Sequence, residues 1–144
     1  MVDPAATLRA MYERINAHDV DGFLAHLSDD FVEHEEAPGL APGKEGVGQF
    51  FSLYMGAFPD LHFEAEEIMV SGDKAIARIR CTGTNSGDFM GMPATGKMVA
   101  VKGVDILRFE DDGLAHEHWG VFDQLGMMQQ LGVVPTPGSA PAPA

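Results

Sequence analysis

Asp105 and His118 have the side-chain types and the spacing of a proton-transfer pair. Asp112-Gly113 lies between two alternating apolar segments and indicates a tight hairpin turn. If these two residues form the turn, Leu107 faces His118 and Asp105 faces Gly120. Asp105 and His118 are then diagonal neighbours on one sheet face, within hydrogen-bond reach. Where apolar side chains surround it, such a pair can transfer protons, because burial and the charge of the partner shift the pKa values of both groups. The alternative is a purely structural contact.

Further side chains around this pair are expected to bind a substrate. The sheet face of the pair also presents Val101, Gly103, His116 and Gly120. In this register Phe109 faces His116, which lies near the hairpin end, where simple solvent exposure is the alternative. Glu33 and His34 lie at the end of the first predicted strand. They form either a polar rim of the pocket or a solvated charge cluster.

The same residues allow a metal-site interpretation. His116-x-His118 on one strand face, together with Glu33, has a ligand composition that suits Zn²⁺ or Fe²⁺. Two histidines and an unplaced third ligand fall short of the three or more protein ligands that a true site needs. We therefore expect no metal at this site.

A glycine-rich loop over residues 85–97 holds two further candidates. Residues 91–98 nearly spell a phosphate-binding P-loop, but they lack its final Ser/Thr and precede a strand instead of a helix, which excludes that motif. Met90 and Met92 are expected to form an adaptable apolar lid over the pocket mouth. Packing of this loop against the core is the alternative.

Two predicted helices supply apolar walls. Asp3-Pro4 is a good helix start, and the helix that follows has Tyr12 and Ile15 on its apolar face. A later helix, which ends before Pro59, presents Phe51 on its apolar face. We expect these three side chains to contact a bound substrate.

The remaining pattern predicts an α+β fold. A short second helix with Leu27 inward and a strand over residues 31–35 come before the third helix. Alternating segments then follow over residues 61–70, 74–84, 98–109 and 114–122. A phase slip near Glu66-Glu67 indicates a bulge that bends the first of them. Helices followed by a bent meander predict a cone-shaped mixed or antiparallel sheet, with the N-terminal helices enclosing a pocket for a small hydrophobic molecule.

Size and charge narrow the possible partners. The 144 residues fit one domain over residues 1–134, and the Pro/Ala-rich tail over residues 135–144 is expected to be disordered. A formal net charge of −13 disfavours binding to nucleic acid and to anionic membranes. No apolar run approaches the roughly 20 residues of a membrane helix, and the N-terminus lacks the features of a signal peptide. The expected location is the cytoplasm.

The outer face of the last predicted strand suggests self-association. By parity, Trp119 and Val121 point away from the pocket. An exposed apolar patch usually marks an interface, so we expect a homodimer packed through this face.

Several short motifs resemble those of the SnoaL-like polyketide cyclases, within the nuclear transport factor 2-like superfamily. The matching pieces are Asn16, FPD at 58–60, GDFMGMP at 87–93, TGK at 95–97, EHW at 117–119, DQLG at 123–126 and QQLG at 129–132. Their order spans nearly all of residues 5–134. The resemblance implies a cone of helices on a curved sheet, often dimeric, and ring closure by intramolecular aldol condensation without metal or cofactor.

The resemblance also implies a change at the catalytic position. Founding members of the family use an aspartate on the last strand as acid/base, and the resemblance places that aspartate at Gly120 here. Their assisting histidine falls on Asp105, and an asparagine of the first strand falls on Glu33. Glycine cannot transfer a proton, so we expect the carboxylate to have moved across the hairpin to Asp105, with His118 as its partner.

These observations predict an acid/base enzyme that acts on a small, largely apolar carbonyl compound, with Asp105 as general base and His118 as proton partner. Ring closure by aldol chemistry or a related isomerisation fits, because an enolate needs only a base and a donor to its oxygen. Two alternatives stay open. One is a water-activating enzyme that opens epoxides, and the other is a carrier that only binds a hydrophobic ligand.

Overall fold

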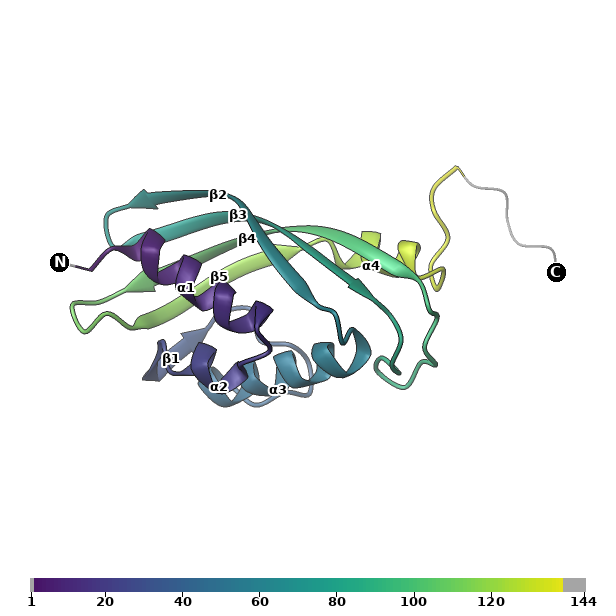
Figure 1. The fold of residues 1–144 in the computed structure, drawn as a ribbon, viewed down its shortest axis with the longest axis horizontal. Coiled ribbons are helices and arrows are strands. Elements are labelled where there is room, and N and C mark those ends of the chain that lie inside the picture. Colours follow the sequence, from purple (N-terminus) through teal and green to yellow (C-terminus); the bar gives the residue numbers. More distant parts are fainter. Residues whose placement is uncertain (1, 139–144) are drawn as a thin grey trace.

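The computed structural model describes residues 2–138 and contains four helices and five strands in that range. Residues 139–144 of the predicted disordered tail lie outside the described part. The elements in chain order are α1 (Pro4–Asn16), α2 (Val20–Leu24), β1 (Leu27–Glu33), α3 (Gly43–Ala57), β2 (His62–Ser71), β3 (Lys74–Thr84), β4 (Met98–Phe109), β5 (Ala115–Phe122) and α4 (Gln124–Gln130) (Figure 1). No described helix is both long enough and apolar enough to cross a bilayer.

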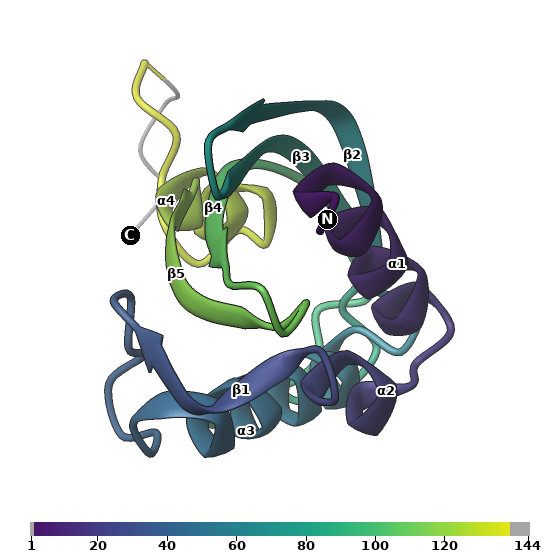
Figure 2. The ribbon, with the colours of Figure 1, turned by 90° about the vertical axis from the view of Figure 1, so that its left-hand side faces the viewer.

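The five strands form one curved, unclosed sheet in the order β1-β5-β4-β3-β2. β1 pairs with β5 in parallel, and all other pairs are antiparallel. Figure 2 shows the sheet arching from β2 round to β5, with α1 along one side and β1, α2 and α3 closing the base. The predicted α+β class and curved mixed sheet are therefore confirmed.

Helix α1 is held at both ends by polar side chains. The Asp3 carboxylate accepts hydrogen bonds from the backbone N–H groups of Ala5 and Ala6, which satisfies two of the free donors at the helix start. At the other end, the Asn16 amide exchanges two hydrogen bonds with the backbone of Phe63 on β2, at 2.8 and 2.9 Å. The helix thus presents a fixed apolar face to the inside of the sheet.

Strand β2 carries the predicted bulge. Its pairing with β3 slips by one residue between Ala65 and Glu67, and the strand bends there. The first strand differs from the prediction, because Leu27 begins β1 instead of ending α2. Leu27 is buried in either case, so its hydrophobicity alone does not distinguish the two structures.

The β4–β5 hairpin differs from the prediction in two ways that cancel. The turn has three residues, 111–113, between Glu110 and Leu114, and Gly113 takes a φ of +79° that favours glycine. A one-residue irregularity in β5 then compensates, because Phe109 pairs with Ala115 while Arg108 pairs with Glu117. The pairings of Asp105 with Gly120 and of Leu107 with His118 are as predicted.

The expected pairing of Phe109 with His116 is therefore wrong. His116 is the extra residue of the irregularity, so it turns to the outer face, and Ala115 turns inward and is fully buried. Sequence parity counted back from His118 does not hold across a bulge, because the additional residue reverses the alternation.

Candidate active site

His118 lies between two carboxylates from neighbouring strands. Its Nδ1 is 2.7 Å from Oε1 of Glu33 on β1, and its Nε2 is 2.9 Å from Oδ1 of Asp105 on β4. β5 is the strand between β1 and β4, so the ring bridges both of its neighbours. The predicted hydrogen bond between Asp105 and His118 is confirmed, and Glu33 proves to be a second partner of the same ring.

Tyr12 of α1 completes a chain of four polar groups. Its hydroxyl donates a 2.6 Å hydrogen bond to Oδ2 of Asp105. Asp105 therefore has a partner on each oxygen, one from the helix and one from β5. We call Tyr12, Asp105, His118 and Glu33 the polar array.

The two carboxylates keep the His118 ring charged. Burial alone would lower the pKa of His118, but the hydrogen bonds to Asp105 and Glu33 and their negative charges outweigh it and raise the pKa to about 10. Both ring nitrogens then carry protons at neutral pH and donate to the carboxylates. His118 is thus a fixed cation in the ground state and not a free base.

Two weakly acidic groups near Asp105, the Tyr12 hydroxyl and the Cys81 thiol, are held in their neutral forms. Burial, together with the charge of Asp105 and the hydrogen bond to it, raises the pKa of Tyr12 far above its ordinary value. Burial and the same charge raise the pKa of Cys81 to about 12, so its thiol stays protonated and is a poor nucleophile. Asp105 therefore accepts hydrogen bonds from the neutral Tyr12 hydroxyl and from the charged His118 ring.

The polar array lies on the wall of a cavity of about 420 Å³. Apolar and aromatic side chains from the helices and the sheet form most of this wall, among them Ile15, Phe50, Phe51, Tyr54, Phe58, Phe63, Val101 and Phe122. Glu35 and Glu36, in the loop after β1, also line it. No lysine or arginine is among the lining residues of the described range, so an anion inside would lack a counter-ion other than His118.

The predicted site residues divide into two groups. The cavity lining includes Tyr12, Ile15, Glu33, Phe51, Val101, Asp105, His118 and Gly120. It does not include His34, Met90, Met92, Gly103 or His116. Met90 is a mostly exposed loop residue, whereas Met92 packs against a buried apolar cluster that includes Phe58 and Phe89. The space above Gly103 is filled by the Cβ of Phe122, 2.9 Å from where a Cβ of residue 103 would lie.

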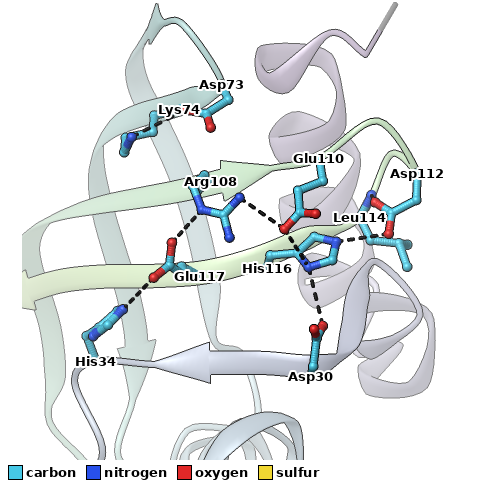
Figure 3. Close-up of polar contacts among 10 residues, drawn as sticks. All are labelled: Asp30, His34, Asp73, Lys74, Arg108, Glu110, Asp112, Leu114, His116 and Glu117. Atoms are coloured by element: carbon cyan, nitrogen blue, oxygen red, sulfur yellow. Dashed lines mark hydrogen bonds and ion pairs between the residues drawn. The ribbon is translucent and has the colours of Figure 1, made fainter.

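The two missing histidines belong to a polar network on the outer face (Figure 3). The His34 ring stacks on Trp119 and contacts Glu117, which is also paired with Arg108. The His116 ring contacts Asp30 of β1 and the hairpin residues Glu110 and Asp112. This network holds the edge strand β1 against β5 from outside. The ligand set His116, His118 and Glu33 is therefore split between two faces, and no group of three or more metal-ligating side chains occurs within residues 2–138.

Comparison with known proteins identifies the scaffold. The family model described as SnoaL-like polyketide cyclase matches residues 5–131. The chain belongs to the SnoaL-like polyketide cyclase family. A search of the curated proteins finds no match.

Solved structures of the same fold support this assignment. AclR of Streptomyces galilaeus, a proposed hydroxylase, is 32% identical, with a TM-score of 0.83 over 92% of this chain and 83% of that one. TsrD of Streptomyces laurentii is 28% identical, with a TM-score of 0.81 over 93% and 100%. IdmH of Streptomyces antibioticus, a proposed polyketide cyclase, is 30% identical, with a TM-score of 0.80 over 90% and 99%. The predicted nuclear transport factor 2-like fold is thereby confirmed.

Sequence reasoning missed two contacts of the array in this SnoaL-like chain, that of Glu33 with His118 and that of Tyr12 with Asp105. Tyr12 was expected only to contact substrate, yet its hydroxyl is 2.6 Å from Asp105, which lies 93 positions along the chain. The hydroxyl in the middle of an otherwise apolar helix face could have indicated a buried polar partner, because a buried Tyr O–H normally finds one.

Proposed function

We propose that this SnoaL-like protein is a cofactor-free acid/base enzyme that acts on a small, hydrophobic, uncharged carbonyl compound, with Asp105 as general base. The supporting observation is the polar array on the wall of an apolar cavity of about 420 Å³. A cavity of this size holds a molecule of two or three fused rings. We expect the enzyme to work in the cytoplasm.

In the first step, Asp105 removes a proton from the carbon next to the substrate carbonyl, and the electron pair of that C–H bond forms an enolate. The negative charge thereby passes from Asp105 to the enolate oxygen. The Tyr12 hydroxyl and the His118 Nε2–H, which bind Asp105 in the ground state, then bind its neutral acid less strongly and can donate to the enolate instead. The donors thus follow the charge without a large movement.

In the second step, the enolate carbon forms a bond to a second carbonyl carbon of the same molecule. The C=O π electrons move to oxygen, and the proton held by Asp105 neutralises the resulting alkoxide. Atoms and charge balance, and Asp105 returns to its ionised form. Reprotonation of the enolate at another carbon would give an isomerisation by the same groups.

Proton abstraction can be tested directly with 2-tetralone, an apolar bicyclic ketone with acidic C–H bonds. We expect the wild type to accelerate exchange of these protons for deuterium in D₂O, measured by proton NMR. Asp105→Asn keeps the shape and should reduce the enzymatic rate by about two to four orders of magnitude. Asp111→Asn, at the exposed hairpin turn, is the matched control and should exchange like the wild type. Normal exchange by Asp105→Asn would refute the assignment.

A second candidate follows from the two carboxylates of the array. Asp105 and Glu33 are joined through one cation, and an array of this kind can also orient and deprotonate a water for epoxide opening. Styrene oxide hydrolysis without 2-tetralone exchange would favour that reaction. Tight binding of 2-tetralone with neither activity would favour the hydrophobic carrier.

A further inference from the structure

Gly120 is the residue of the cavity wall that lies directly across from Asp105 in the β4–β5 register. Its φ is not among the positive values of the chain, so the backbone conformation does not require a glycine at this position. Glycine inside a strand lowers stability because it adds entropy to the unfolded chain and packs no side chain. The explanation must therefore lie in the space above it.

That space is occupied by the two central members of the polar array. A Cβ on residue 120 would lie 2.7 Å from Nε2 and 2.9 Å from Cε1 of His118, and 3.0 Å from Oδ1 of Asp105. Ordinary contacts of a carbon atom begin at roughly 3.5 Å, so a side chain here would overlap both partners. A Cβ at position 120 would thus lie beside the hydrogen bond between His118 and Asp105, too close to both of the atoms that form it.

The ring would move before the backbone does. Residue 120 is paired with β4 within a continuous ladder, whereas the clashing atoms of His118 are at the far end of a side chain. The opposite ring nitrogen is held by Glu33, so a rotation away from residue 120 keeps that contact and breaks the one to Asp105. Asp105 would retain only the hydroxyl of Tyr12.

We propose that Gly120 is a positioning residue whose missing side chain allows His118 to reach Asp105 across the hairpin. Any larger residue at this position separates the carboxylate from its imidazolium partner and leaves the sheet intact. Only the expected effect of Gly120 on turnover rests on the proposed function. The effect of Gly120 on the contact between His118 and Asp105 concerns the protein without substrate, and the NMR titration described next measures it.

The test uses Gly120→Ala and an NMR titration of the His118 imidazole. The groups that face this ring are Glu33 from β1 and Asp105 from β4, and Asp105 in turn contacts Tyr12 of α1. Loss of the Asp105 contact should lower the pKa of His118 by about 1 or more. Gly56→Ala on α3, where a Cβ meets nothing within 4 Å, is the matched control and should leave the titration unchanged.

Exchange of 2-tetralone supplies the second readout. Gly120→Ala should slow it about tenfold or more, since the imidazolium no longer supports the transfer of charge from Asp105. In a His118→Ala background, which removes the clashing atoms, adding Gly120→Ala should have little further effect. This non-additivity separates a positioning role from general damage to the strand.

The outcomes distinguish the two proposals. An unchanged His118 titration in Gly120→Ala overturns the positioning role, as does an equal loss of exchange with and without His118. A lowered pKa with undiminished exchange supports the positioning role and refutes catalysis by the Asp105–His118 pair. A lowered pKa with no exchange by any variant, wild type included, leaves the positioning role supported and refutes the enzymatic proposal for this class of ketone.

Discussion

Removal of the charged histidine should change how the stability of the protein depends on pH. The pKa of His118 is raised from 6.5 to about 10 in the folded protein, chiefly because two carboxylates outweigh the effect of its burial. The folded state therefore holds one more proton than the unfolded state between these two values. The stability contributed by His118 is fully present below about pH 6.5 and is lost as the pH rises toward 10.

The slope in this window follows from one proton. Between pH 7.5 and 8.5 the ring is almost fully protonated when folded and almost fully neutral when unfolded. The free energy of unfolding should then fall by about 1.4 kcal/mol over that one pH unit, because one proton per molecule is released on unfolding. His118→Gln lacks the titrating ring and should lack this part of the slope.

Urea unfolding followed by circular dichroism at pH 6.5, 7.5 and 8.5 measures the effect as the difference between wild type and variant. Groups that do not interact with His118 cancel in that difference. His62→Gln, an exposed histidine on β2 at the other edge of the sheet, is the control and should keep the wild-type slope. Glu33→Gln removes one of the two carboxylates that raise the pKa of His118 in the folded protein. The pH range over which stability falls should therefore end at a lower pH than in the wild type. Parallel stability curves for wild type and His118→Gln would refute the charged state of the ring.

Three further predictions concern the array, the cavity and the outer face. Tyr12→Phe leaves Oδ2 of Asp105 without its donor and should cost about 1–3 kcal/mol in urea unfolding, with a smaller cost in an Asp105→Ala background. Methyl anthracene-2-carboxylate should bind at least about tenfold more tightly than the free acid in fluorescence titrations, because no lysine or arginine lines the cavity within residues 2–138; equal affinities would contradict this. We propose a homodimer through the face of β4 and β5 that carries the exposed, paired Val104 and Val121 beside Trp119. Val121→Glu should then give a monomer by light scattering, and a monomeric wild type at high micromolar concentration would exclude the interface.

The sequence predicted what depends on neighbours along the chain. Alternation located the bulge in β2, and the turn motif placed Asp105 opposite Gly120, so the contact between Asp105 and His118 could be derived from the hairpin alone. Local signals were also the source of the error at His116. The turn is one residue longer than predicted and β5 contains a bulge, so the register beyond the bulge is as predicted. Between the turn and the bulge, however, the residues of β5 point to the opposite faces of the sheet.

What the sequence did not predict depends on the tertiary arrangement. Glu33 reaches His118 only because β1 adds in parallel to β5, and parallel pairing of strands about 85 positions apart has no turn to set its register. Tyr12 reaches Asp105 only because α1 crosses the inside of the sheet. The polar array therefore draws on four elements, of which one hairpin contributes two.

Three polar residues in or next to the motifs that carry the family resemblance stabilise the fold away from the cavity. Asn16 binds the backbone of β2, Asp60 accepts hydrogen bonds from the N–H and hydroxyl of Thr84, and buried Asn85 accepts from Thr95. None of these residues lines the cavity. Their side chains satisfy backbone and loop groups at the ends of strands, so their contacts in this chain are structural. Gly120 makes no such structural contact. The side chains nearest to it are those of His118 and Asp105, the proposed catalytic pair. We propose that, in this chain, an aspartate at position 120 and the hydrogen bond between Asp105 and His118 exclude each other, because the Cβ of residue 120 would lie 2.7 Å from Nε2 of His118.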